Sequence, residues 1–210
     1  MKAYIFPGQG SQFQGMGKSL CEQHPDVQSY FDKADKIVGF DLKNTMFEGS
    51  EEALKETRVT QPAVYVYSYA SAMTHGNEFE PEAVAGHSLG EFTALAAAEV
   101  FSFEEGLRLV QERALAMQEA CEKQDSTMAA ILGLEDEAVE KICGAIDDVV
   151  VPANYNCPGQ LVISGSQRGI ERAVDAMKEA GAKRAIILKV GGAFHSPLMT
   201  TARDRLKRAI

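Results

Sequence analysis

The sequence lacks the features that mark metal-binding, secreted or membrane proteins. Its four cysteines, Cys21, Cys121, Cys143 and Cys157, lie far apart and form no Cys-x-x-Cys pair, and no histidine stands at metal-ligand spacing from them. We therefore predict free thiols and no metal site. No apolar run is long enough to span a bilayer, and the N-terminus lacks the apolar core of a signal peptide. These absences predict a cytoplasmic protein without membrane association.

Signatures of nucleotide and nucleic-acid binding are also missing. The glycine-rich loop of residues 8–17 fits neither the dinucleotide fingerprint nor the P-loop. We expect its backbone N–H groups to face a developing anion instead. The net charge of −9 and the absence of aromatic residues interleaved with basic ones argue against nucleic acid as a partner.

The charge is distributed unevenly along the 210 residues. Residues 181–210 hold seven basic residues against one acid, a net +6, which leaves −15 on the other 180 residues of a chain whose total is −9. A basic end on an acidic protein indicates either a landing site for an anionic partner or a solvated helix face. The residues alone leave both readings open.

One short motif organises the chain, Gly86-His87-Ser88-Leu89-Gly90. A small apolar run, residues 83–85, precedes it and predicts a strand, while residues 91–98 are rich in helix formers. A Gly-x-Ser-x-Gly between a strand and a helix is the context of a nucleophile elbow, in which a strained turn exposes the serine oxygen. The alternative is a chance Gly-Ser-Gly turn. The flanking elements favour Ser88 as a nucleophile.

The first half of the chain predicts an α/β unit, with a strand over residues 3–6 followed mainly by helices. We expect helices over residues 25–38 and 51–55, a helix over 63–73 that begins at Gln61-Pro62, and a long helix up to about residue 123 that opens at a capping box, Ser102 to Glu105.

From Ser126 the pattern becomes strand, helix, strand, strand, helix, strand. The expected ranges are 128–134, 135–146, 149–154, 160–164, 167–180 and 184–190. This order is the signature of a ferredoxin-like fold. We predict a ferredoxin-like subdomain at 126–189, inserted into a larger domain formed by 1–125 and 190–210. The last residues predict a further helix.

A serine nucleophile needs a base and donors for an oxyanion. His195 is the candidate base, because it follows a strand in a loop of small residues while the other histidines fit surface or turn-supporting roles. The backbone N–H groups of Leu89, at the helix start, and Gln12, in the glycine-rich loop, are the candidate donors. Arg113 lies in a helix with apolar neighbours, and a buried arginine requires an anionic partner.

Five segments together resemble the malonyl-CoA:acyl carrier protein transacylase family. They are FPGQGSQ (6–12), GHSLGE (86–91), QERALAMQ (111–118), NYNCPGQ (154–160) and GAFHS (192–196), and they span the whole chain in order. The resemblance implies an α/β-hydrolase-like domain with a parallel sheet and a ferredoxin-like (βαββαβ) insertion. It implies an acyltransferase of fatty acid biosynthesis that moves a malonyl group from malonyl-CoA to the phosphopantetheine thiol of acyl carrier protein, without a cofactor.

The resemblance also assigns roles to residues. Ser88 matches the family nucleophile, His195 the base, and Arg113 the group that pairs with the malonyl carboxylate, for which a planar guanidinium is suited. Gln12 and Leu89 match the oxyanion-hole amides. Phe194 matches the pattern of malonyl-selective members, and Asn154 and Asn156 are expected to shape the site. The basic end then has natural partners in acidic carrier protein and in the phosphates of CoA.

Members of the family continue beyond the last helix of this sequence, where the resemblance places further strands and a glutamine that orients the catalytic histidine. A catalytically impaired, shortened homologue is therefore one alternative. A serine acyl hydrolase is another, but a serine esterase calls for an acid after Ser88 to orient His195 and gives Arg113 no role. A patatin-like hydrolase calls for an Asp-Gly turn, which the sequence lacks.

Overall fold

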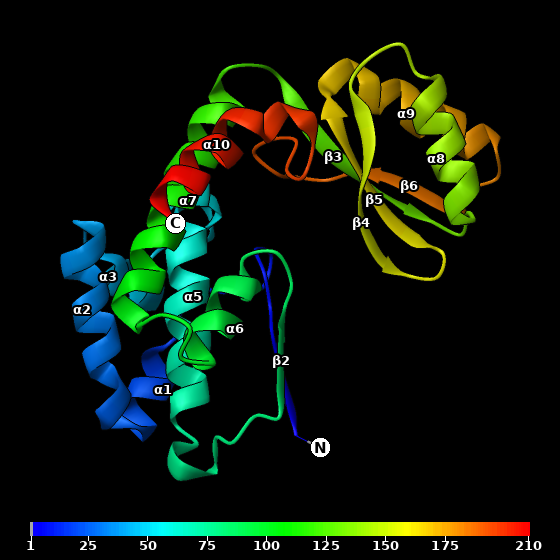
Figure 1. Cartoon of the computed structure of the whole chain (residues 1–210). Coiled ribbons are helices and arrows are strands. Elements are labelled where there is room, and N and C mark those ends of the chain that lie inside the picture. Colours follow the sequence, from blue (N-terminus) through cyan, green and yellow to red (C-terminus); the bar gives the residue numbers. More distant parts are fainter. Residues whose placement is uncertain (1) are drawn as a thin grey trace. The chain divides into compact units, whose positions relative to one another are not determined.

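The computed structural model describes residues 2–210, which form two compact units of mixed α/β structure (Figure 1). The first comprises residues up to Leu115 together with Ala209–Ile210, and the second comprises Ala116–Arg208. A parallel sheet lies in the first unit and an antiparallel sheet in the second. The predicted α/β class is confirmed.

The sheet of the first unit joins segments that are far apart in sequence. Strand β1 (Ala3–Phe6) pairs in parallel with β2 (Ala83–Gly86), with Ala3 opposite Ala83 and Phe6 opposite Gly86. The intervening chain is helical: α1 (Lys18–Gln23), a 3₁₀ turn (Pro25–Val27), α2 (Gln28–Val38), α3 (Leu42–Glu48), α4 (Glu51–Lys55), α5 (Thr57–Met73) and a 3₁₀ turn (Gly76–Glu78). Helix α6 (Gly90–Ala97) and the long α7 (Phe103–Glu122) follow β2.

Helix α5 is the central element of this unit, because most of its residues are buried. The predicted start of this helix at Gln61-Pro62 is wrong, since α5 begins at Thr57 and Pro62 lies inside it. Thr57, Val59 and Thr60 are buried, so tertiary packing outweighs the hydrogen bond that Pro62 cannot donate. The hydroxyl of Tyr65 donates to the carbonyl of Phe103 at 3.0 Å and fixes α5 against the start of α7.

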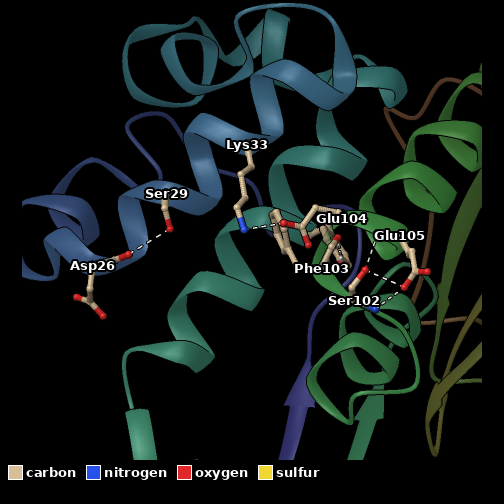
Figure 2. Close-up of polar contacts among 8 residues, drawn as sticks. Asp26, Ser29, Lys33, Ser102, Phe103, Glu104 and Glu105 are labelled. Carbon is tan, nitrogen blue, oxygen red and sulfur yellow. Dashed lines mark hydrogen bonds and ion pairs between the residues drawn. The ribbon is translucent and has the colours of Figure 1, made fainter.

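The start of α7 carries the predicted capping box (Figure 2). Ser102 N and Oγ both donate to Glu105 Oε2 at 2.8 Å, and Glu105 N donates back to Ser102 Oγ at 3.2 Å. Next to it, Lys33 of α2 forms an ion pair with Glu104 at 2.6 Å, which holds the pKa of that carboxyl below its usual range. The long helix that carries Arg113 is therefore anchored at its first turn.

The second unit contains the predicted strand and helix order. Its elements are β3 (Ser126–Leu132), α8 (Asp136–Ala145), β4 (Val150–Cys157), β5 (Gln160–Ser166), α9 (Gln167–Glu179) and β6 (Arg184–Ile187), followed by a 3₁₀ turn (Pro197–Met199) and α10 (Thr200–Ala209). The sheet order is β4-β5-β3-β6, with every neighbouring pair antiparallel. The predicted strand ends differ by a few residues; β6 ends at Ile187 rather than at residue 190.

The sheet of the second unit buries apolar residues on both faces. Ala129, Ile131, Leu161 and Ile163 pack with residues of α8 and α9 in one cluster. Met128 and Val162 point to the opposite face, as strand alternation requires, and pack with Phe194, Met199 and Ala202. Phe194 is thus held in a core beside the loop that carries His195.

Candidate active site

The predicted elbow is present between β2 and α6. Ser88 adopts a positive φ of 53°, which is uncommon for a residue with a side chain. Among the described residues only Ser88, Glu99 and His195 share this feature outside glycine. Backbone strain of this kind persists where the surrounding structure holds it and is concentrated at functional sites. Two of the three strained residues are the predicted nucleophile and the predicted base.

The two outer glycines of the motif allow the turn to pack tightly. A Cβ on Gly86 would lie 2.0 Å from the carbonyl carbon of Gly90, and a Cβ on Gly90 would lie 2.1 Å from the carbonyl oxygen of Phe6. Both distances are far below any real contact of a Cβ. The two ends of the elbow therefore pack closely against each other, and its second glycine packs against the end of β1, as the glycine pattern predicts.

Arg113 of α7 reaches the elbow serine. Its Nη2 donates to Ser88 Oγ at 2.9 Å, and its Nη1 donates to Gln61 Oε1 at 2.5 Å. The centre of the guanidinium lies 5.8 Å from the centroid of the Phe92 ring, within the range of a cation–π contact. Helices α5, α6 and α7 of the first unit thus bring one cation to the candidate nucleophile.

The charge of Arg113 has no carboxylate partner within ion-pair distance among the described residues. Burial lowers the pKa of Arg113 to about 10, while Glu91 acts in the opposite direction. A buried cation is costly unless it is paired, and its hydrogen-bond partners here, an amide and a hydroxyl, are both neutral. The arrangement favours an anionic ligand group beside Ser88.

The candidate oxyanion donors lie on the same elbow and on the loop next to it. A Cβ on Gly8 would lie 2.5 Å from the carbonyl oxygen of His87, so the glycine-rich loop packs directly on the motif. Gln12 Oε1 accepts from Gly10 N at 2.8 Å and shapes that loop. Within residues 2–210, neither Gln12 N nor Leu89 N donates a hydrogen bond to another residue. Both N–H groups are therefore not used by other described residues.

His195 lies in the second unit, in the loop between β6 and α10. Its φ of 57° is held by hydrogen bonds around it, in which Ser196 Oγ donates to Ala193 O at 2.7 Å and Ala193 N donates to Ser126 Oγ at 3.1 Å. Phe194 is buried beside it. Of the two predicted asparagines, Asn154 pairs with Val162 within the sheet, and Asn156 is exposed near the end of β4.

The structure therefore brings four of the predicted residues, Ser88, Arg113, Gln12 and Leu89, into the first unit around one elbow. His195, Phe194, Asn154 and Asn156 belong to the second unit.

Gln61 is absent from the predicted site. The signal that could have found it is a glutamine in an otherwise apolar stretch, Gln61-Pro62-Ala63-Val64, because a buried amide requires a partner.

No group of three or more histidine, cysteine, aspartate or glutamate side chains is arranged to bind a metal ion in residues 2–210. No helix in that range is both long and apolar enough to cross a membrane. The four cysteines are free thiols.

Comparison with known proteins relates the whole chain to one group of enzymes. The model of the acyl transferase domain family matches residues 3–210. Malonyl CoA-acyl carrier protein transacylases of Bacillus subtilis (strain 168) and Escherichia coli O157:H7 are 44% and 43% identical to it, over 99% and 97% of this chain. In both cases the match covers 67% of the relative, so this chain spans about two thirds of their length.

Solved structures agree with this relationship. The malonyl CoA-acyl carrier protein transacylase of Coxiella burnetii superposes with a TM-score of 0.94 at 40% identity, over 99% of this chain and 67% of that one. A malonyl-transacylase in complex with the acyl-carrier protein of a type II PKS gives a TM-score of 0.93 at 41% identity, over 97% of this chain and 67% of that one.

Proposed function

Because the chain belongs to the acyl transferase domain family, alongside the malonyl CoA-acyl carrier protein transacylases, we propose that it transfers a malonyl group from malonyl-CoA to acyl carrier protein. The reaction serves fatty acid biosynthesis and needs no cofactor, because the nucleophile, base and oxyanion donors all come from the chain. A cytoplasmic location belongs to the same proposal.

One observation carries this proposal: a buried guanidinium with only neutral partners donates to the hydroxyl of the elbow serine at 2.9 Å. In a malonyl thioester a single methylene separates the carboxylate from the reacting carbonyl. A cation that binds this carboxylate must therefore lie directly beside the nucleophile, as Arg113 does. A longer dicarboxylic acyl group would call for a more distant cation.

The proposed reaction has two balanced steps. Ser88 Oγ attacks the thioester carbonyl while His195 accepts its proton, and the oxyanion is bound by the N–H groups of Gln12 and Leu89. The C–S bond breaks, and the CoA thiolate takes the proton from His195. The phosphopantetheine thiol of the carrier protein then gives its proton to His195 and forms a new C–S bond to the malonyl carbonyl. The ester C–O bond to Ser88 breaks, and His195 returns the proton to Ser88 Oγ.

The remaining site residues have supporting roles in this proposal. Phe194 contributes to the selection of malonyl over other acyl groups, and Asn154 and Asn156 contribute to substrate binding. The basic segment 181–210 attracts the phosphates of CoA and the acidic carrier protein. In α10, Arg205 is paired with Glu119 at 2.7 Å, whereas Lys207 and Arg208 are exposed and suited to contact a partner.

We also propose the finer description of the fold. Residues 126–189 form a ferredoxin-like subdomain, which the sheet order β4-β5-β3-β6 and the helices α8 and α9 packed on one face support. Residues 1–125 and 190–210 belong to an α/β-hydrolase-like domain, which the parallel pair β1–β2 and the elbow support.

Labelling with radioactive malonyl-CoA tests the proposal. The chain should acquire one malonyl group, which Ser88→Ala abolishes and the exposed-serine control Ser29→Ala does not. Carrier protein should then remove the label as malonyl-carrier protein. Release of free malonate at a rate independent of carrier protein would instead assign a hydrolase. A folded chain that acquires no label would contradict the proposal and favour the catalytically impaired homologue.

A further inference from the structure

Gln61 is a polar residue buried in the first unit. Its side chain is fully buried in α5, among residues of the main apolar cluster of the first unit. A buried amide that lacks hydrogen bonds destabilises a protein, so its presence calls for a specific partner. The partner of its oxygen is Arg113, at 2.5 Å from Nη1.

The contact with Gln61 orients the guanidinium of Arg113. With Nη1 on Gln61 and the guanidinium carbon over the Phe92 ring, the other terminal nitrogen, Nη2, donates to Ser88. A guanidinium is planar and rigid, so hydrogen bonds from both terminal nitrogens restrict its orientation. The guanidinium of Arg113 therefore lies at the candidate nucleophile, where the substrate is proposed to react.

The charge of the residue at this position matters as much as its geometry. A glutamate would accept the same hydrogen bond but would also neutralise the guanidinium and repel a ligand carboxylate. The neutral amide of Gln61 holds Arg113 in place and leaves its positive charge for an incoming anion.

We propose that Gln61 is a positioning residue that determines specificity, holding the Arg113 guanidinium at Ser88 with its charge uncompensated so that carboxylated acyl groups are selected over uncharged ones. The proposal rests on the proposed function for the identity of the acyl group. It goes beyond that function because it assigns part of the selectivity to a residue of α5 that acts through Arg113.

Two measurements on the full chain test it, calorimetric binding of malonate and the rates of Ser88 labelling by malonyl-CoA and acetyl-CoA. Gln61→Glu keeps the size and the acceptor, and Gln61→Leu keeps the approximate volume without the acceptor. Gln61→Glu should weaken malonate binding and lower the ratio of malonyl to acetyl labelling by about tenfold or more, since losing a charge-assisted contact has at least that effect. Gln61→Leu should lower the ratio less.

Val66→Ala is the matched control, because Val66 is fully buried in the same helix and makes no contact with the guanidinium among those described above. It should lower the thermal unfolding temperature and leave the labelling ratio unchanged. A merely structural role for Gln61 would give its variants the same behaviour, and that result would overturn the proposal.

The two readouts separate this proposal from the proposed function. If the parent chain binds malonate and Gln61→Glu does not, the positioning role is supported. This holds even if malonyl-CoA does not label the parent, a result that would overturn the proposed function alone. Equal malonate affinity in the parent and Gln61→Glu overturns the positioning role, whatever the labelling shows. Absence of malonate binding by the parent overturns it as well.

Discussion

Replacing Gly90 by alanine tests whether the elbow depends on its contact with the end of β1. In the structure the added Cβ would lie 2.1 Å from the carbonyl oxygen of Phe6, and 2.8 Å from both the carbonyl carbon of Phe6 and the carbonyl oxygen of Pro7. All three obstructing atoms belong to the backbone. No side-chain rotation can relieve the clash, so either α6 or the end of β1 must move.

The size of the effect follows from these distances. Real Cβ atoms essentially never approach other atoms within 3.0 Å, so the start of α6 must shift by nearly an ångström. Overpacking of this kind typically costs about 1–3 kcal/mol, and a clash confined to backbone belongs at the upper end, about 3 kcal/mol. A misplacement of about 1 Å at a reacting group can lower a rate by about a hundredfold. Ser88 is two residues away and should suffer this loss.

The assay combines urea unfolding, followed by far-ultraviolet circular dichroism, with the rate of Ser88 labelling by malonyl-CoA. Gly144→Ala is the matched control, because Gly144 lies in α8 and a Cβ there meets nothing within 4 Å. It should stabilise the chain by about 0.4–1 kcal/mol. A Gly90→Ala chain that unfolds at the urea midpoint of the parent and labels at its rate would refute the reasoning.

Three further expectations concern other parts of the chain. Ser102→Ala removes the capping box of α7 and should cost about 1 kcal/mol, seen as a lower unfolding temperature; an unchanged temperature would contradict this. Arg113→Lys replaces two terminal nitrogens, one on Gln61 and one on Ser88, by a single nitrogen that cannot bind a carboxylate in the bidentate way. Malonyl labelling should therefore fall relative to acetyl labelling by about tenfold or more, whereas an equal fall in both would assign Arg113 a structural role. Burial raises the pKa of the Cys143 thiol to about 11, so its stabilising contribution is fully present below pH 9 and is lost as the pH rises through 11. The parent should lose free energy of unfolding relative to Cys143→Ala between these pH values, and parallel profiles would contradict the assignment.

The sequence predicts those parts of the structure whose causes are local. The elbow follows from Gly-x-Ser-x-Gly between a strand and a helix, and the glycine contacts explain why the pattern is informative. The capping box at Ser102 and Glu105 is likewise a short-range arrangement with an unambiguous residue pattern. The strands and helices of the second unit alternate with turn residues, and the sequence predicts their ends to within a few residues.

The parts that were missed depend on packing between distant segments. Helix α5 begins at Thr57 because burial of its first turn outweighs the proline inside it, and burial cannot be read from propensity. Helices α1 and α3 are only six and seven residues long, too short for a clear apolar period. The cap of α3 at Asp41, whose side chain accepts from Asn44 N, is a local signal that the sequence does contain.

The contact between Gln61 and Arg113 is hidden for the same reason. The two residues are 52 positions apart and lie on different helices. Apolar neighbours of Arg113 indicate that it is buried, but they do not indicate which group accepts its hydrogen bond. The roles given to His195, Phe194, Asn154 and Asn156 stay predictions.

The parallel pairing of β1 with β2 has a consequence for how the enzyme is made. Residues 2 and 82 already exchange a hydrogen bond across a separation of 80 residues, and the ladder continues from there to the turn before Ser88. During synthesis β1 cannot pair until β2 has been translated. Pairing of strands that are far apart in sequence is slow. The position of the nucleophile thus depends on a strand that is translated about 80 residues before the strand that leads into Ser88. An added tag or a truncation that disturbs residues 3–6 should abolish activity, although it alters no group that contacts the substrate.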